Sequence, residues 1–294
     1  MNGNCDPGGP ADGHVVRDGL RIAFLDWGAG RFDADPLVVL HPNGFCAGFF
    51  DPLARRISDQ FRVVGVDLRG HGFSDRVVDQ RRLGNDDMAT DVLAVADHLG
   101  LDRFSLLGHS LGGGVSIEAA AAAPERVSAV MLCEAIAVGR FEADVEEGAP
   151  SLAVTARRRR PVWPDRATVR ASYGSRPPLN ALAPEALAAY VRWGFVDRDD
   201  GQVELACAPE TEAGIFDSGS RHGPLQTFQR LGGVSAPTSV LAGTLTDLAA
   251  TWFVDQAEIL GTEVVWVEGG HFFLFEDIDR AEGLVRFQDR KSVV

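Results

Sequence analysis

Ser110 stands at the centre of a Gly-x-Ser-x-Gly pattern that spans residues 108–112. An apolar run leads into the pattern and an apolar, helix-length segment follows it, so the serine is expected on a sharp strand-to-helix turn. Such a turn crowds the positions two residues before and after the serine, where glycine fits best. The hydroxyl then projects at a helix N-terminus, where the helix dipole favours developing negative charge. The pattern predicts a nucleophilic serine rather than a phosphate-binding loop, which would need a Lys-Ser or Lys-Thr pair after its glycines.

A serine hydroxyl becomes an effective nucleophile only when a neighbouring base takes its proton. Among the seven histidines, His271 is the predicted base, because it follows the last apolar run and two glycines free the backbone to present its ring. His41 and His109 lie in strand-end or glycine-rich motifs and are expected to hold loops together. His71 lies in an Arg-Gly-His-Gly turn and is expected to be part of that turn.

Acyl transfer at a serine also needs two backbone N–H groups that bind the negatively charged oxygen of the tetrahedral intermediate, the oxyanion hole. Leu111 follows the predicted nucleophile and supplies the first N–H. The second comes from the turn after an earlier apolar run, in the sequence His-Pro-Asn-Gly-Phe. Pro42 has no N–H, which narrows the second donor to Asn43, the preferred candidate, or Gly44.

Short apolar runs alternate with helix-length segments from residue 19 onward, a rhythm typical of a mainly parallel sheet with helices on both faces. The expected strands are residues 21–26, 37–40, 62–66, 104–107, 128–132, 238–241 and 263–267. The expected helices are residues 87–99, 111–123, 249–260 and 279–288.

This rhythm is interrupted between about residues 138 and 234, where Arg, Pro and Ala are frequent and strand-like runs largely vanish. We interpret the interruption as an inserted helical cap, whose clearest helix is residues 184–193. The expected organisation is therefore a core in two parts and a cap between them: 1–137, 138–234 and 235–294. The aromatic residues of the cap could either line a substrate pocket or form the cap's own small core: Trp163, Tyr190 and Trp193.

Four motifs occur in an order that resembles the α/β-hydrolase superfamily: residues 41–44, 65–72, 108–112 and 269–271. The resemblance spans nearly the whole chain except the cap. It implies an eight-stranded, mostly parallel sheet flanked by helices, a lid inserted between strands six and seven, and a triad of serine, acid and histidine that needs no cofactor. The expected fold class is accordingly α/β, in the form of an α/β-hydrolase fold with an inserted helical cap.

The acid of the triad has two candidates. Asp247 follows the seventh strand, where the family most often keeps its acid, but the usual Gly-x-x-Asp spacing would put that acid at Thr246. Glu134 ends the sixth strand, and its distance from Ser110 in the sequence is similar to that in haloalkane dehalogenases and zearalenone lactonases. We favour Glu134 and keep Asp247 as the alternative.

A serine nucleophile predicts hydrolysis of a carboxylic ester through an acyl-enzyme on Ser110. The resemblance to zearalenone lactonases suggests a lactone as a possible substrate. Dehalogenases and epoxide hydrolases of this architecture attack with aspartate, and the dehalogenase pattern has tryptophan at the position of Leu111, so both activities are disfavoured. Two alternatives remain: a cofactor-free haloperoxidase or oxygenase that uses the same triad, and a non-catalytic ligand-binding protein.

The composition of the 294 residues narrows the partners, because 28 Lys and Arg against 42 Asp and Glu give a net charge of −14. Nucleic acid is therefore not an expected partner, and the arginines at 157–160 are expected to form a solvated helix face or to bind an anionic substrate group. The N-terminus resembles no signal peptide and no run of about 18 apolar residues occurs, so a cytoplasmic protein without a membrane partner is expected. The four scattered cysteines predict free thiols and no metal site. A small-molecule substrate and a possible homo-oligomer complete the expectation.

Overall fold

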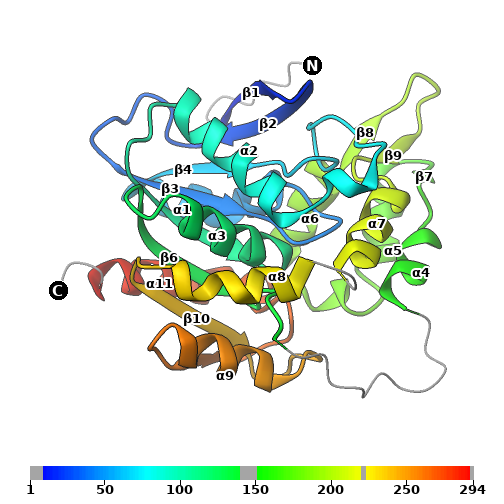
Figure 1. Cartoon of the computed structure of the whole chain (residues 1–294). Coiled ribbons are helices and arrows are strands. Elements are labelled where there is room, and N and C mark those ends of the chain that lie inside the picture. The colour runs from blue at the N-terminus through cyan, green and yellow to red at the C-terminus, as the bar shows by residue number, and fades with distance from the viewer. Residues whose placement is uncertain (1–8, 140–150, 220–222, 292–294) are drawn as a thin grey trace.

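An eight-stranded sheet forms the centre of the computed structural model, which describes residues 9–139, 151–219 and 223–291 (Figure 1). The strand order is β1-β2-β4-β3-β5-β6-β10-β11. β1 pairs with β2, and β2 with β4, in antiparallel orientation, and the other pairs are parallel. This arrangement confirms the expected fold class. The strands are β1 (Ala11–Arg17), β2 (Leu20–Asp26), β3 (Asp35–Leu40), β4 (Phe61–Val66), β5 (Phe104–His109), β6 (Val127–Cys133), β10 (Thr238–Gly243) and β11 (Val264–Val267).

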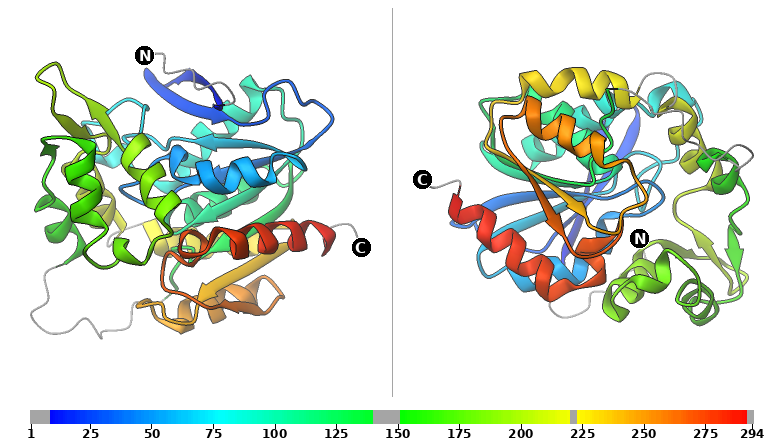
Figure 2. Two further views of the ribbon diagram at one scale, coloured as in Figure 1. Left: turned by 180° about the vertical axis from the view of Figure 1, so that it is seen from behind. Right: turned by 90° about the horizontal axis from the view of Figure 1, so that it is seen from below.

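Helices cover both faces of the sheet and enclose one hydrophobic cluster on each side (Figure 2). One cluster packs Val92, Val115 and Phe253 of α2, α3 and α9 against the sheet, and the other packs Leu53 and Ala281 of α1 and α11 against the opposite face. The four helices expected from the sequence are all present within a few residues of their expected bounds. The helices of the core are α1 (Asp51–Ile57), α2 (Asn85–His98), α3 (Leu111–Ala122), α9 (Ala250–Ile259), α10 (Phe273–Glu276) and α11 (Ile278–Lys291).

Apart from α8, the described part of the insert after β6 lies beyond the carboxyl end of the sheet, and the insert is only partly helical (Figures 1 and 2). Its helices are α4 (Leu152–Arg157), α5 (Arg166–Tyr173), α6 (Pro184–Trp193), α7 (Pro209–Gly219) and α8 (Gly223–Arg230). It also contains a small antiparallel sheet that the expected helical cap lacked, made of β7 (Val162–Trp163), β9 (Val203–Leu205) and β8 (Phe195–Asp197) in that order. These strands have two or three residues each, which is too short for an alternating pattern to appear in the sequence.

Helix α8 falls inside the expected cap but packs against the core. Thr227 on α8 donates a hydrogen bond of 3.0 Å from Oγ1 to the Glu118 carboxylate on α3. Asn85, which begins α2, donates from Nδ2 to the same Thr227 oxygen over 3.0 Å. Short 3-10 turns complete the described elements: η1 (Ala47–Phe50), η2 (Gln80–Arg82), η3 (Leu179–Ala181) and η4 (Leu231–Gly233).

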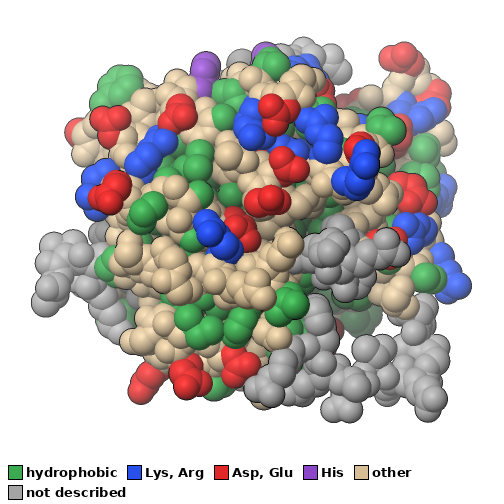
Figure 3. All heavy atoms as spheres, viewed as in Figure 1, with side chains coloured by type: hydrophobic (Ala, Val, Ile, Leu, Met, Phe, Trp, Pro, Cys, Tyr) green, Lys and Arg blue, Asp and Glu red, His purple; other side chains and the backbone are tan. Residues whose placement is uncertain are grey.

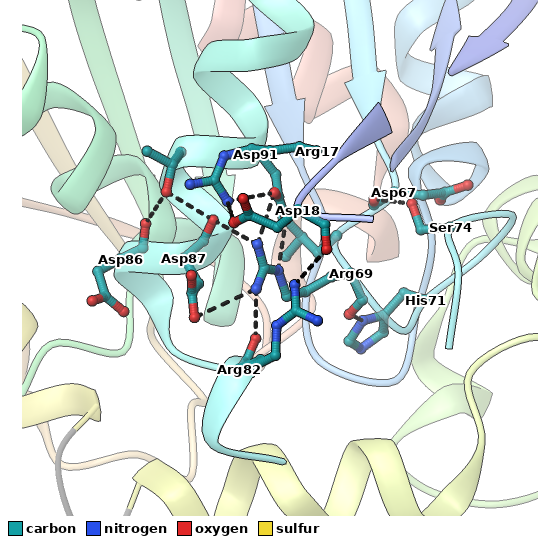
Figure 4. Close-up of polar contacts among 12 residues, drawn as sticks. Arg17, Asp18, Asp67, Arg69, His71, Ser74, Arg82, Asp86, Asp87 and Asp91 are labelled. Carbon is teal, nitrogen blue, oxygen red and sulfur yellow. Dashed lines mark hydrogen bonds and ion pairs between the residues drawn. The ribbon is translucent and has the colours of Figure 1, made fainter. Parts of the chain in front are cut away.

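A buried ion pair fixes the loop that follows β4 (Figure 4). Arg69 and Asp91 have fully buried side chains, and the guanidinium meets the carboxylate through Nε at 2.7 Å and Nη2 at 2.8 Å. The Arg69 Nη1 also donates to the Arg82 carbonyl oxygen over 2.8 Å. Because Asp91 lies on α2, this pair ties the loop to the helix layer and holds His71, two residues further on, in a fixed place.

The surface carries its charges in mixed groups. On the face shown in Figure 3, the coloured Lys and Arg side chains lie among Asp and Glu side chains and do not form a continuous basic stripe. Ion pairs on the exposed surface account for part of this mixing, such as Arg81 with Asp79 at 2.8 Å and Arg126 with Asp97 at 2.6 Å. None of the helices in the described ranges combines the length and the apolar character that crossing a bilayer requires.

Candidate active site

Ser110 lies between β5 and α3 in a strained backbone conformation, with φ of 56° and ψ of −114°. Its N–H donates to the Cys133 carbonyl oxygen on β6 over 2.9 Å, which holds the turn against the neighbouring strand. A Cβ atom on Gly108 would overlap the Gly112 carbonyl oxygen, and one on Gly112 would overlap the Leu40 carbonyl oxygen of β3. The two glycines therefore allow the close approach of strand and helix that the sequence pattern predicts.

Glu134 occupies the equivalent place at the end of the next strand. The parallel register of β5 and β6 aligns His109 with Cys133, so that Ser110 and Glu134 each follow this pair directly. Glu134 also has a positive φ of 51°, and its side chain is fully buried. Two strained residues side by side at the carboxyl edge of a sheet are typical of a functional site.

The Glu134 carboxylate accepts three hydrogen bonds, which compensate for its burial. His271 Nδ1 lies 3.0 Å from Oε2, and Thr246 Oγ1 donates to the same oxygen over 2.6 Å. The other oxygen, Oε1, accepts from the Gly243 N–H over 2.7 Å. Asp247, the alternative acid, is exposed, so the structure brings His271 to Glu134 and not to Asp247.

His109 fixes the loop that carries His271. Its Nε2 lies 2.7 Å from the His271 carbonyl oxygen, and the two rings are 4.9 Å apart between centroids. Burial lowers the pKa of His109 well below its ordinary value, and the neighbouring His271 lowers this pKa further. His109 is therefore neutral, with its proton on Nε2 as the donor to that carbonyl. Glu276 accepts from the Gly270 N–H over 3.1 Å and secures the same loop.

His71 and His41 together hold the turn that contains the expected second oxyanion donor. His71 Nε2 accepts from the Gly44 N–H over 3.1 Å, and His41 Nε2 accepts from the Leu68 N–H over 3.0 Å. Burial lowers the pKa of His71 to about 4 and also lowers the pKa of His41, so both rings are neutral acceptors at neutral pH. The sequence predicted the structural role of His41, and it placed His71 in a turn without finding its bond to Gly44.

The hydrogen bond to His71 engages the Gly44 N–H, which leaves Asn43 as the second donor of the expected oxyanion pair. Within the described ranges, the N–H groups of Asn43 and Leu111 have no protein acceptor. Leu111 is the first residue of α3, where the N–H groups of a helix have no partner within the helix. N–H groups without a protein acceptor are the kind of donor that an oxyanion hole needs.

The family model of the alpha/beta hydrolase fold matches residues 35–278. The chain belongs to the α/β-hydrolase family. The match includes all the residues of the site described above, from Leu40 to Glu276. It also includes the whole insert between β6 and β10.

Curated relatives of this hydrolase are about one third identical to it in sequence over the part of the chain that aligns. It is 32% identical, over 135 residues, to a putative non-heme haloperoxidase from Mycobacterium phage D29, a match to 46% of each chain. It is 33% identical, over 193 residues, to a 2-(acetamidomethylene)succinate hydrolase from Mesorhizobium japonicum, covering 61% of this chain and 69% of that protein. Across eight such relatives, the chain spans between 34% and 69% of their length.

Among solved structures, an E-2-(acetamidomethylene)succinate hydrolase superimposes with a TM-score of 0.77. The superposition covers 94% of this chain and 97% of the other, at 21% sequence identity. At this level of identity the likeness concerns the fold alone.

The three aromatic candidates of the insert have different environments. Trp163 is buried in the insert itself, where its Nε1 donates to the Arg160 carbonyl oxygen over 2.9 Å. Tyr190 is 1% exposed and stacks on Phe45 with 4.3 Å between ring centroids. Trp163 thus packs within the insert, whereas Tyr190 packs between the insert and the core turn at Gly44 and Phe45. Trp193 is only partly buried, packs against Gly48 and meets the ring of Phe73 edge-on.

A cavity of about 500 Å³ lies at the opposite edge of the sheet from Ser110. It opens at the amino ends of the central strands and is lined by residues such as Ser105, Ala129 and Thr238. Because Ser110 follows the carboxyl end of β5, this cavity is separate from the site of the expected chemistry. Within the described part of the chain, no group of three or more His, Cys, Asp or Glu residues is placed to hold a metal ion.

Proposed function

We propose that this α/β-hydrolase is a serine hydrolase that cleaves carboxylic esters through an acyl-enzyme on Ser110. The observation that carries the proposal is the 3.0 Å contact between His271 Nδ1 and the buried Glu134 carboxylate, beside the strained serine. With Nδ1 bonded to Glu134, the imidazole presents Nε2 as its basic nitrogen. The acid fixes this tautomer and stabilises the imidazolium that forms when the serine proton is taken.

In the proposed mechanism, His271 takes the Ser110 proton as the hydroxyl oxygen attacks the ester carbonyl carbon. The N–H groups of Asn43 and Leu111 stabilise the oxyanion of the tetrahedral intermediate. His271 then protonates the leaving alcohol, and the acyl group stays on the serine. A water molecule, deprotonated by the same imidazole, releases the acid and restores Ser110.

The substrate class includes lactones, because a lactone is an ester whose leaving alcohol remains attached to the acyl group. The chemistry at the serine is the same for both, and only the shape of the pocket distinguishes them. Of the three aromatic candidates, we assign Trp193 to substrate contact, since its side chain remains partly exposed where it packs against Gly48 and Phe73 of the core.

A second candidate function is perhydrolysis, favoured by the 32% identity to a protein named as a putative non-heme haloperoxidase. Hydrogen peroxide would replace water in the attack on the acyl-enzyme and release a peroxy acid, which then oxidises halide. This function uses the same serine and differs from hydrolysis only in the second nucleophile.

The test is a turnover screen over p-nitrophenyl esters of increasing acyl length, small lactones and macrolactones, each with and without peroxide and bromide. Ser110→Ala is the control, and labelling with a fluorophosphonate, located by mass spectrometry, reports the reactivity of the serine directly. We expect ester turnover and labelling at Ser110, both abolished in Ser110→Ala. An unlabelled Ser110 and a parent without turnover would favour the ligand-binding alternative and contradict the proposal, and activity only with peroxide would favour perhydrolysis.

A further inference from the structure

Two residues of the insert hold the turn that carries the proposed oxyanion donor. Asn43 donates from Nδ2 to the Glu212 carbonyl oxygen on α7 over 3.0 Å, across 169 positions of the sequence. The Tyr190 hydroxyl on α6 donates to the Gly44 carbonyl oxygen over 3.1 Å, across 146 positions. Consecutive residues of one turn are thus bonded to two different helices of the insert.

Arg159 connects these two contacts. Its Nη2 donates to the Tyr190 hydroxyl oxygen over 2.7 Å, and its Nη1 forms an ion pair with the Glu212 carboxylate. A closed ring of contacts results, which runs from Asn43 through the insert and back to Gly44. The sequence predicted that residues 157–160 form a solvated helix face or bind an anionic substrate group, and Arg159 departs from the first prediction because its side chain is only 19% exposed.

The ion pair lies directly on the turn. Gly44 has a positive φ of 79°, and a Cβ atom there would lie 2.7 Å from Glu212 Cδ and 2.9 Å from Arg159 Nη1. The ring of Phe45, the next residue, stacks on Tyr190. The turn is therefore packed as well as hydrogen-bonded, and it cannot move without a matching movement of α6 and α7.

The guanidinium also strengthens the hydrogen bond from Tyr190. A positive charge that donates to the phenol oxygen polarises the O–H bond, which makes the hydroxyl a better donor to the Gly44 carbonyl. Burial raises the pKa of Tyr190, so the phenol keeps its proton and remains a donor. On the other side of Gly44, its N–H is held by His71. Both peptide units that follow Asn43 are thus held. The preceding unit, which carries the Asn43 N–H, is held through the Pro42 carbonyl oxygen, which lies 2.9 Å from His41 Nδ1 and accepts from the Phe45 N–H over 3.2 Å. Because Tyr190 bonds to Gly44 and stacks on Phe45, it helps to fix the direction of the Asn43 N–H.

We propose that Tyr190, polarised by Arg159, is a positioning residue that preorganises the Asn43 N–H for the oxyanion. The inference rests on the proposed serine hydrolase function. It gives the insert a part in the chemical step, in addition to covering the site. Because preorganised donors act mainly in the transition state, loss of the Tyr190 hydroxyl should lower kcat and leave KM nearly unchanged.

The experiment compares Tyr190→Phe with Tyr173→Phe in the full chain. Tyr173 is the matched control, because its hydroxyl also receives a hydrogen bond from Arg159 Nη2, at 3.2 Å, while only Tyr190 donates to Gly44. One missing oxyanion donor costs about 10²-fold to 10³-fold in kcat, so a misplaced donor should cost about tenfold. We expect this loss for Tyr190→Phe, with an equal loss of affinity for a trifluoromethyl ketone, whose serine adduct carries an oxyanion. Tyr173→Phe should retain the kcat of the parent and its affinity for the ketone.

Further variants separate the possible failures. Equal turnover by Ser110→Ala and the parent would contradict the proposed function itself. If Ser110→Ala is inactive and the two tyrosine variants have equal kcat, the positioning role is wrong while the proposed function stands. Arg159→Lys covers the case in which Tyr190→Phe does not fold: a single ammonium keeps the charge beside Glu212 but lacks the fork that also reaches Tyr190, so kcat and ketone affinity should again fall together. Unchanged kcat in a folded Arg159→Lys would overturn the inference.

Discussion

Thr246 donates its hydroxyl to Glu134 Oε2 over 2.6 Å, the same oxygen that lies 3.0 Å from His271 Nδ1. Thr246 occupies the position where the usual spacing in the family would put the acid. Here it donates a hydrogen bond to a carboxylate that comes from a different strand, β6. Its own oxygen accepts from the Leu248 N–H over 3.2 Å, which orients the hydroxyl proton toward Glu134. The loop after β10 thus supplies a hydrogen bond in place of a charge.

The first prediction concerns the identity of the acid. Glu134→Gln should lower kcat/KM for ester hydrolysis on the order of 10³-fold or more, because an amide neither fixes the tautomer nor stabilises the imidazolium of His271. Asp247→Asn should leave the rate within about twofold of the parent, since Asp247 is exposed and lies outside the contacts of the imidazole. Steady-state kinetics of both variants on one ester decides whether Glu134 or Asp247 is the acid. A larger loss in Asp247→Asn than in Glu134→Gln would reverse the assignment.

The second prediction moves the acid to the other strand. Thr246→Asp should restore part of the rate that Glu134→Ala removes, because the Thr246 hydroxyl lies 2.6 Å from the Glu134 oxygen that contacts His271. We expect the double variant to be at least about tenfold faster than the single variant in kcat, a small part of the loss that a missing triad acid causes. Glu134→Ala combined with Thr244→Asp is the control, since Thr244 is exposed on the same loop. Equal rates in the two double variants, both folded, would show that residue 246 cannot serve as the acid.

The third prediction concerns the dependence of stability on pH. His71 has its pKa lowered to about 4 by burial, against an ordinary value of 6.5 in the unfolded chain. Between these values the unfolded state binds more protons, so the free energy of unfolding falls as pH decreases from 6.5 toward 4. A shift of this size corresponds to about 3 kcal/mol. Asp67 has the opposite effect on the free energy of unfolding, because burial raises its pKa from 3.8 to about 6. Its buried carboxyl loses a proton as pH rises from 3.8 toward 6, and the free energy of unfolding falls over that interval.

A glutamine at this position isolates the contribution of His71. In His71→Gln, the amide oxygen can still accept from the Gly44 N–H but does not titrate, so the unfolding free energy should depend less on pH between 4 and 6.5, by about 3 kcal/mol. Urea titrations at four pH values measure the effect. His14→Gln, at an exposed position of β1, is the matched control and should keep the dependence of the parent. The same pH dependence in His71→Gln and the parent would contradict the assignment.

The central sheet and the serine turn could be predicted because their signals are local. The buried parallel strands are continuous apolar runs, and the glycines at 108 and 112 report a steric requirement of the turn itself. β1 escaped prediction because this antiparallel edge strand, with residues such as Asp12 and His14, is largely exposed and polar. Hydrogen bonds to β2 hold this segment as a strand, and the hydrophobic pattern of its sequence does not indicate a strand.

The remaining parts of the site depend on contacts between distant segments, which one sequence does not reveal. Glu134 and Asp247 were both plausible acids, and only the packing of the loop after β10 brings Thr246 and His271 to the first of them. The burial of Arg159 escaped prediction for the same reason: its neighbours in the sequence are exposed arginines, and its partners are Glu212 and Tyr190 from other helices.

The last prediction concerns the ion pair beneath the loop that carries His71. Arg69→Met leaves the Asp91 carboxylate buried without its bidentate partner, and a 3.3 Å contact with Arg17 is the one ion pair that it keeps among the described residues. An uncompensated buried charge costs about 3 to 5 kcal/mol of unfolding free energy. Since the Arg69 carbonyl oxygen lies 3.1 Å from His71 Nδ1, kcat should fall as well if the loop shifts. Arg81→Met, in an exposed pair, should change the unfolding free energy little.

A double variant shows whether the cost comes from the charge or from the shape of the site. Arg69→Met combined with Asp91→Leu removes both charges, so it should recover a large part of the stability that the single variant loses. Urea unfolding of the parent, both single variants and the double variant gives the coupling energy directly. If the double variant is no more stable than Arg69→Met, the guanidinium stabilises the loop through its hydrogen bonds to the carbonyl oxygens of Arg82 and Asp87 and not through its charge. Recovery of stability without recovery of kcat would show that the pair fixes the loop in its active geometry beyond what folding alone requires.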